Sequence, residues 1–353
     1  MESATYSYTY HDILVTGGCG FVGSNLINHL LRRFPNVRIV NIDKMDYCSS
    51  AGNIDEEYRD DSKRYVLIPG SLCDLNLVYN VLTMYKIEVV LHLAAQSHVQ
   101  NSFGNSLQFT QDNIVGTHSL LEAAKRYNNA TLNLHLFIYM STDEVHGDST
   151  LGPAEGGGQT FNPTNPYAAT KAACELLVGS YSKSFGLPAI IVRSNNIFGP
   201  RQHTEKLIPQ FIQRLRAGEK CKIQGSGEQM RTFVYVEDVC EAFVTIIKKG
   251  RINEVYEIGS NDEFTVLEIA RILVETLTSP HPSSLSSVET LASSLRHYPH
   301  PSDLDEYIEY IADRDFNDFR YNVDTSKLEA LGWSRKYTFD HGLDETIKHF
   351  LGT

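Results

Sequence analysis

The chain has 353 residues, of which 42% are apolar and 21% charged, a balance ordinary for a folded protein of one large or two moderate domains. The net charge of −12 disfavours nucleic acids and anionic membranes as partners, and no apolar run approaches the roughly 20 residues of a membrane-spanning helix. The polar first residues lack the pattern of a signal peptide and the six dispersed cysteines form no C-x-x-C pair, so we expect a cytoplasmic protein with reduced thiols and no metal site.

The first half of the chain alternates apolar runs with segments of helical periodicity. Helices are expected at residues 21–34, 77–86, 119–127 and 165–185, and strands at 12–17, 37–43, 63–70, 87–95, 134–141 and 188–196. Because the strands are almost continuously apolar and mostly alternate with helices, the pattern predicts an α/β fold with a Rossmann-like, doubly wound parallel sheet.

The second half has shorter elements. Helices are expected at 205–218, 236–250 and 265–277, and short strands at 221–225, 231–236 and 254–259. We therefore expect residues 1–196 to form a dinucleotide-binding domain and residues 197–353 a smaller α+β lobe for substrate, intertwined with the first domain. The Ser-, Pro- and His-rich stretch 278–303 is expected to be a flexible surface loop.

A glycine-rich turn, "VTGGCGFVG", connects the first expected strand to the first helix. Such a turn can serve packing alone, but its glycines also let a pyrophosphate approach the backbone N–H groups of a helix N-terminus. Asp43 ends the second expected strand, 20 residues after Gly23. A carboxylate there can bind the adenosine ribose and repels a 2′-phosphate, so the context predicts NAD rather than NADP.

Four titratable residues are candidates for chemistry. Tyr167 and Lys171 share one face at the start of an expected helix, and a lysine cation together with a positive nicotinamide ring favours the phenolate that could accept a hydroxyl proton. Asp143 and Glu144 follow the fifth expected strand, at the edge where open α/β sheets bind ligands. Ser141-x-x-Glu144 also fits a helix capping box, so this stretch alone leaves capping and catalysis open.

Six motifs together carry a resemblance to a known family: "TGGCGFVG", "LHLAAQSHV", "MSTDEV", "PTNPYAATK", "SNNIFGP" and "EKLIPQFI". Over residues 11–349 the chain resembles the extended short-chain dehydrogenase/reductases, and within them the nucleoside-diphosphate-glucose 4,6-dehydratases. The discriminating feature is Thr-Asp-Glu on the fifth strand, because epimerases and simple reductases of the family usually have Ser or Thr there without the acidic pair.

The resemblance implies a lyase that converts UDP-glucose or dTDP-glucose to the 4-keto-6-deoxy sugar with tightly bound NAD, an early step of rhamnose or other deoxysugar biosynthesis. It implies that Tyr167 removes the O4 proton beside Lys171, Thr142 binds O4, Glu144 removes the C5 proton and Asp143 protonates the departing C6 hydroxyl. Alternatives are a 4-epimerase or decarboxylase on the same scaffold, or a non-catalytic NAD-sensing protein.

The resemblance also implies binding positions. Those for the cofactor, with Tyr167 and Lys171, are Gly17, Gly20, Phe21, Val22, Gly23, Asp43, Lys44, Asp46, Ser71, Leu72, Leu93, Ala94, Ala95, Ser97 and Asn196. Those for the substrate are His98, Thr142, Asn196, Lys206, Leu207, Ile208, Arg231 and Arg314.

The chain departs from the family pattern at three places. Ser71 stands where an aspartate usually contacts the adenine, and Asp315 stands where proline is common. His146 replaces the usual tyrosine after "DEV", either as a loop residue, which we favour, or as a substrate contact.

Substrate and partners follow the family expectation. "HVQNSFGNSLQFT" and "MDYCSS" are more similar to the enzymes acting on UDP-glucose than to those acting on dTDP-glucose. We expect a homodimer through "GTHSLLEAAKRY" and the helix that carries Tyr167, and a separate epimerase/reductase for later steps.

Overall fold

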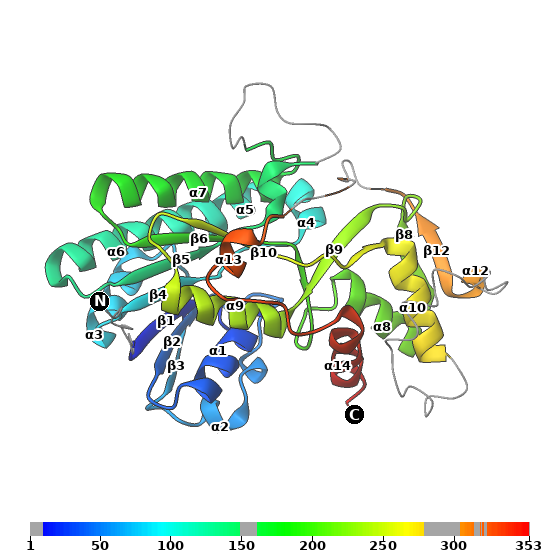
Figure 1. Cartoon of the computed structure of the whole chain (residues 1–353), viewed down its shortest axis with the longest axis horizontal. Coiled ribbons are helices and arrows are strands. Elements are labelled where there is room, and N and C mark those ends of the chain that lie inside the picture. The colour runs from blue at the N-terminus through cyan, green and yellow to red at the C-terminus, as the bar shows by residue number, and fades with distance from the viewer. Residues whose placement is uncertain are drawn as a thin grey trace.

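The structure is a computed structural model that describes residues 10–148, 161–278, 304–313, 318, 320 and 323–352. Figure 1 shows a larger part built around a central sheet, beside a smaller part that includes the C-terminal helix. Arg314, Asp315 and nearly all of the loop expected at 278–303 lie outside the described residues. Among the helices that the structure describes, none has the length and apolar character needed to cross a membrane.

The central sheet has seven strands, and every neighbouring pair is parallel. Its order across the sheet is β10 (Val255–Ile258), β6 (Ala189–Ser194), β5 (Leu136–Met140), β4 (Val89–His92), β1 (Asp12–Thr16), β2 (Arg38–Asp43) and β3 (Tyr65–Pro69). From β1 the chain adds strands first on one side and then, from β4 onward, on the other. This reversal opens a crevice at the carboxyl ends of β1 and β4, where doubly wound folds bind ligands.

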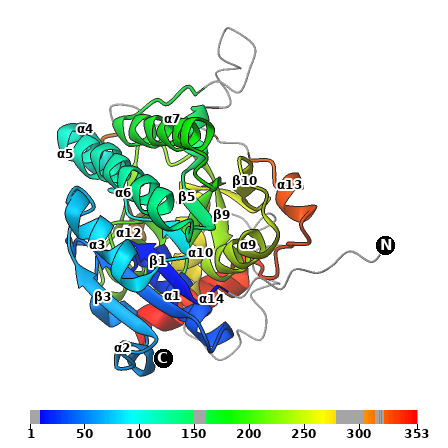
Figure 2. The ribbon, with the colours of Figure 1, turned by 90° about the vertical axis from the view of Figure 1, so that its left-hand side faces the viewer.

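Helices cover both faces of this sheet, and the predicted Rossmann-like fold is confirmed. One face packs against α1 (Phe21–Arg33) and α9 (Val236–Lys249), and the other against α3 (Leu75–Tyr85), α6 (Gly116–Thr131) and α7 (Pro166–Phe185). Figures 1 and 2 show the two layers on opposite sides of the strands. The apolar faces of the strands are buried on both sides, which explains their near-continuous apolar runs.

Two strands differ from the sequence-based expectation. We expected 254–259 in the smaller lobe, but β10 pairs with β6 in the large sheet, and α9 packs against α1 in the same core. The segment 188–196 was expected to be one strand, but β6 ends at Ser194 and β7 (Asn196–Phe198) begins in another sheet. The chain changes sheet at Asn195, whose backbone N–H still donates to the carbonyl of Ile258, and residues 194–196 line the cavity at this crevice.

The smaller part holds two small sheets and its own core. One sheet has the order β11 (Glu263–Thr265), β9 (Met230–Tyr235) and β7, and the other pairs β12 (Ile308–Ile311) with β8 (Cys221–Gln224). The helices here are α8 (Leu207–Arg216), α10 (Val266–Thr278), α12 (Leu304–Tyr307) and α14 (Phe339–Leu351). Short helical segments elsewhere are η1 (Ala51–Asn53), α2 (Glu56–Arg59), α4 (Val99–Gly104), α5 (Ser106–Phe109), η2 (Thr110–Val115), η3 (Asp143–His146) and α13 (Ser326–Glu329).

Candidate active site

The glycine turn after β1 is too tightly packed for side chains. A Cβ on Gly17, whose φ is +72°, would lie 2.7 Å from the Cα of Ala94, and one on Gly23 would lie 2.3 Å from the carbonyl oxygen of Gly17. Gly20 is the N-cap of α1 and provides no side-chain cap. The first N–H groups of a 13-residue helix therefore border the crevice, and this arrangement suits a pyrophosphate.

A cavity of about 310 Å³ runs from this turn to the end of β5. All the residues that the sequence proposed for the cofactor line it, including Ser71, Asn196, Tyr167 and Lys171. Thr142, Asp143 and Glu144 line it as well. The lining fits a dinucleotide, because it combines the N–H groups of a helix N-terminus with the carboxylates of Asp43 and Asp46.

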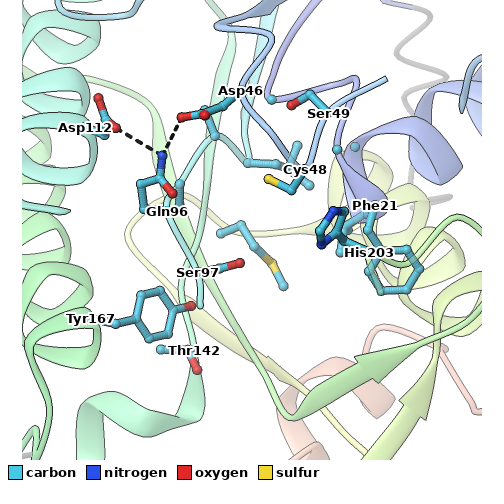
Figure 3. Close-up of a pocket in the computed structure, with 18 of the residues that line it drawn as sticks. Phe21, Asp46, Cys48, Ser49, Gln96, Ser97, Asp112, Thr142, Tyr167 and His203 are labelled. Carbon is cyan, nitrogen blue, oxygen red and sulfur yellow. Dashed lines mark hydrogen bonds between the residues drawn. The ribbon is translucent and has the colours of Figure 1, made fainter. Parts of the chain in front are cut away.

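The nucleotide end of the cavity is a hydrogen-bonded cluster, shown in Figure 3. The Gln96 amide donates to Asp46 (2.8 Å) and to Asp112 (3.2 Å), and the Lys44 ammonium lies 3.0 Å from the Asp112 carboxylate and 3.4 Å from that of Asp46. A hydrogen bond from the backbone N–H of Tyr47 lowers the pKa of Asp46, and Gln96 and Lys44 act in the same direction. Sequence reasoning named Lys44 and Asp46 but missed Gln96 and Asp112.

Asp43 is buried at the end of β2. Its two carboxylate oxygens accept the backbone N–H groups of Cys19 and Met45, each at 2.8 Å. A carboxylate has about four acceptor positions, so the predicted contacts to a ribose are compatible with these two bonds. The bonds also fix Asp43 against the glycine turn.

The catalytic end begins at the 3-10 turn η3. Thr142 caps this turn by accepting the N–H of Glu144 at 3.3 Å, whereas the Ser141 hydroxyl has no hydrogen-bond partner among the described residues, so the capping box that the sequence left open does not form. The Asn195 amide donates to Asp143 (2.9 Å), and the Asn165 amide donates to Glu144 (2.9 Å). The cap is therefore Thr142, and both carboxylates remain directed to amide donors beside the cavity.

Burial raises the pKa of both members of the acidic pair. Burial, followed by the charge of Glu144, raises the pKa of Asp143 to about 7. Burial also raises the pKa of Glu144, while the hydrogen bond from Asn165 opposes the change. A pKa of about 7 leaves a substantial share of Asp143 protonated near neutral pH, as a general acid requires.

Helix α7 places Tyr167 and Lys171 opposite this pair. Asn165 caps the helix by accepting the N–H of Ala168 at 2.8 Å, and Pro166 occupies the first turn, as expected. Figure 3 shows the Tyr167 ring beside Thr142 at the lower end of the cavity.

The pKa of Tyr167 differs from the expectation of a favoured phenolate. Burial, then the charges of Glu144 and Asp143, raise the pKa of Tyr167 above its ordinary value. The Lys171 ammonium donates to the carbonyl of Met140 and lies 4.5 Å from the centre of the Tyr139 ring, and burial lowers the pKa of Lys171 to about 8. The protein groups alone therefore hold Tyr167 as a phenol.

A second cavity of about 320 Å³ continues from the first into the smaller part. Glu144, Asn196 and Lys206 line both cavities, and His98, Leu207, Ile208 and Arg231 line the second. The Lys206 ammonium donates to the carbonyl of Ser97 at 2.8 Å, and the His98 side chain caps α4. The predicted substrate residues within the described chain thus meet around one continuous space; Arg314 lies outside the described residues.

Comparison with known proteins shows the family to which the chain belongs. The model of the GDP-mannose 4,6 dehydratase family matches residues 14–346. The chain is 39% identical to a human dTDP-D-glucose 4,6-dehydratase, covering 96% of this chain and 89% of that protein. It is 39% identical to a trifunctional UDP-glucose 4,6-dehydratase/epimerase/reductase of Arabidopsis thaliana, covering 98% of this chain and 48% of the plant protein.

A solved structure agrees with both sequence comparisons. The dTDP-glucose 4,6-dehydratase of Streptomyces venezuelae, determined with NAD bound, has a TM-score of 0.81 and 29% identity, covering 97% of each chain. The family expected from the six sequence motifs is confirmed. The chain belongs to the nucleoside-diphosphate-glucose 4,6-dehydratases of the extended short-chain dehydrogenase/reductase family.

Proposed function

We propose that the protein is an NAD-dependent dehydratase that converts a nucleoside-diphosphate glucose to its 4-keto-6-deoxy derivative. The observation that carries the proposal is the position of Asp143 and Glu144, which share one cavity with Tyr167, Lys171 and the glycine turn. An epimerase needs the tyrosine and the cofactor but has no use for two carboxylates with raised pKa values.

Each residue has a role in the proposed reaction. Tyr167 accepts the proton of the sugar O4 hydroxyl, Thr142 binds O4, and Lys171 holds the cofactor ribose. Bound NAD supplies the oxidation at C4 and, at the end, the reduction at C6. The positive nicotinamide ring would also oppose the protein groups that hold Tyr167 as a phenol.

The acidic pair performs the elimination between these two redox steps. The 4-keto group acidifies the hydrogen on C5, so Glu144 can remove that proton as a base. Asp143 donates its proton to the C6 hydroxyl, which leaves as water while a C5–C6 double bond forms, and Glu144 returns its proton to C5 when C6 is reduced. The pKa of about 7 for Asp143 supports this division, because the acid must be protonated when the hydroxyl leaves.

The finer preference for UDP-glucose is also a proposal. It rests on the similarity of "HVQNSFGNSLQFT" and "MDYCSS" to UDP-glucose enzymes, and the human and plant relatives are equally similar to the chain. Uracil and thymine differ by one methyl group, which is worth roughly 1–3 kcal/mol in a fitted pocket. Both substrates should therefore be offered in one competition assay.

We also propose a cytoplasmic homodimer. Its six free cysteines suit a reducing compartment. Leu132 at the end of α6 and Leu176 and Phe185 on α7 are exposed by 78%, 63% and 50%, which supports burial of this face against a second copy. Light scattering after chromatography should give twice the mass of one chain.

The function is tested by incubating purified protein with UDP-glucose and dTDP-glucose without added reductant. The expected product is a 4-keto sugar whose C6 carbon has become a methyl group, which NMR identifies. A C4 epimer, or no conversion of either substrate by protein that retains NAD, would overturn the proposal.

A further inference from the structure

A polar group with a buried centre and a partly exposed histidine lies behind the catalytic turn, outside both cavities. It consists of His146 on η3, Arg193 on β6, Glu175 on α7 and Glu257 on β10. Arg193 and Glu175 are each exposed by only 3%. None of the four lines the cavities, so the catalytic roles proposed above do not account for them.

Arg193 is the centre of this group. Its Nε and Nη2 donate to the two oxygens of Glu175 at 2.9 and 2.7 Å, a bidentate pair. The remaining Nη1 lies 2.9 Å from Nε2 of His146 and 3.4 Å from Oε1 of Glu257. The other oxygen of Glu257 accepts the backbone N–H of Asp324 at 2.7 Å. These contacts fix β6, α7 and β10 relative to η3.

The hydrogen bond between Arg193 and His146 defines the tautomer of the His146 ring. A guanidinium only donates hydrogen bonds, so Nε2 of His146 must accept and the ring must be neutral with its proton on Nδ1. If Nε2 of His146 carried a proton, its N–H group would point at Nη1 of Arg193, which donates hydrogen bonds and cannot accept one. The nearby group that could accept a hydrogen bond from such an N–H group is Oε1 of Glu257, which lies 3.6 Å from Nε2.

The residues at both ends of this chain of contacts are close in sequence to the proposed catalytic residues. His146 is the last residue of the four-residue turn that begins with Asp143 and Glu144. Glu175 lies one helical turn after Lys171 on α7, the helix that also carries Tyr167. The chain from His146 through Arg193 to Glu175 therefore connects the acidic pair to the tyrosine and lysine from behind the cavity.

We propose that His146 is a positioning residue, which accepts a hydrogen bond from Arg193 and so holds Asp143 and Glu144 in register with Tyr167 and Lys171 for the elimination. The inference rests on the proposed dehydratase function. It assigns a role to the histidine that stands at the family's usual tyrosine position. The charged groups around His146 are Asp143 and Glu144 on its own turn, Glu175 on α7, Arg193 on β6 and Glu257 on β10.

The test compares His146→Leu, which removes the acceptor, with His146→Gln, whose amide oxygen can still accept from Arg193. In the leucine variant kcat should fall roughly 10- to 100-fold, the cost of a misplaced catalytic group, while KM and NAD content stay unchanged. Because C4 oxidation continues and elimination slows, reduced nicotinamide should accumulate in single-turnover absorbance traces. His146→Gln should restore most of kcat and remove the accumulation.

A matched control is His29→Leu, which removes a buried histidine that lies 3.0 Å from Glu237, between α1 and α9. It should show no accumulation of reduced nicotinamide. If His146→Leu does not fold, His146→Asn carries the same prediction, because its shorter amide does not reach Arg193.

Two outcomes would contradict the inference: His146→Leu turns over at the wild-type rate, or it loses activity without accumulating reduced nicotinamide. These are distinct from failure of the proposed function, in which the wild-type protein itself forms no 4-keto sugar.

Discussion

The two ends of the cofactor cavity hold carboxylates in opposite electrostatic states. At the nucleotide end, the backbone N–H of Tyr47, the Gln96 amide and the Lys44 ammonium lower the pKa of Asp46. At the catalytic end, burial and the neighbouring Glu144 raise the pKa of Asp143 to about 7, although Asn195 donates to it. The same functional group thus has a lowered pKa at one end and a raised pKa at the other.

The difference comes mainly from burial and from the hydrogen-bond donors, and the position of the nearest cation adds to it. Lys44 lies directly against two carboxylates, whereas the Lys171 ammonium is hydrogen-bonded to the carbonyl of Met140. A carboxylate supplied with donors and a cation suits binding, and a buried carboxylate beside a second one has the raised pKa that acid catalysis needs. Substitutions at the catalytic end should therefore change the rate or the pH dependence of stability, and a substitution at the nucleotide end should change the affinity for NAD. Four substitutions test this difference.

The largest effect is expected for Glu144→Gln. The amide keeps the shape of the side chain but cannot accept the C5 proton, so kcat should fall about 10³-fold. NAD content should not change, and reduced nicotinamide should accumulate because oxidation at C4 precedes the blocked step. The exposed Glu219→Gln serves as the control, and undiminished turnover by Glu144→Gln would exclude Glu144 as the base.

A somewhat smaller loss, about 10²-fold, is expected for Tyr167→Phe, because water or Thr142 can partly replace the phenol. The affected step is now the first one, so reduced nicotinamide should not accumulate in single-turnover traces. Accumulation equal to that of Glu144→Gln would show that Tyr167 does not act at C4.

Stability should change with pH in Asp143→Asn. The pKa of Asp143 rises from 3.8 to about 7 on folding, so the folded state binds its proton more tightly than the unfolded chain. The stabilisation is complete below the unfolded pKa and is lost as pH rises through about 7. Asparagine imitates the protonated form.

The melting temperature of Asp143→Asn should therefore exceed that of the wild type by a few degrees at about pH 8, and the difference should disappear near pH 4. Calorimetry across this range measures it. A variant that is less stable than the wild type at alkaline pH would contradict the raised pKa of Asp143.

The smallest effect is expected at the nucleotide end. Lys44→Ala removes a partly exposed ion pair and should weaken NAD binding only about 2- to 5-fold, with kcat unchanged at saturating cofactor. Fluorescence titration of NAD measures the affinity. A loss of kcat comparable to that of Tyr167→Phe would remove the distinction between the two ends.

Much of the fold could be predicted from local patterns. The long apolar strands and amphipathic helices of the first half were found in order, because each carries its own periodicity. The short strands β11 and β12 were missed, since three or four residues carry no periodic signal. Strand β10 was assigned to the wrong sheet because its pairing with β6 depends on the tertiary fold.

The residues of the candidate site likewise divide into those that local sequence patterns reveal and those that depend on the tertiary fold. The glycine turn, Tyr167, Lys171 and the acidic pair have fixed spacings, so the sequence reveals them. Gln96 and Asp112 were missed because their partners are up to 68 residues away. The raised pKa of Tyr167 could not be read from the sequence either, because burial and the charges of η3 produce it.

The central claim, dehydration with internal return of hydrogen, is tested most directly with glucose nucleotide deuterated at C4. The account predicts a 4-keto product whose C6 methyl group contains one deuterium, formed without added reductant. Loss of the label to solvent, or a labelled product that retains its C6 hydroxyl, would contradict it.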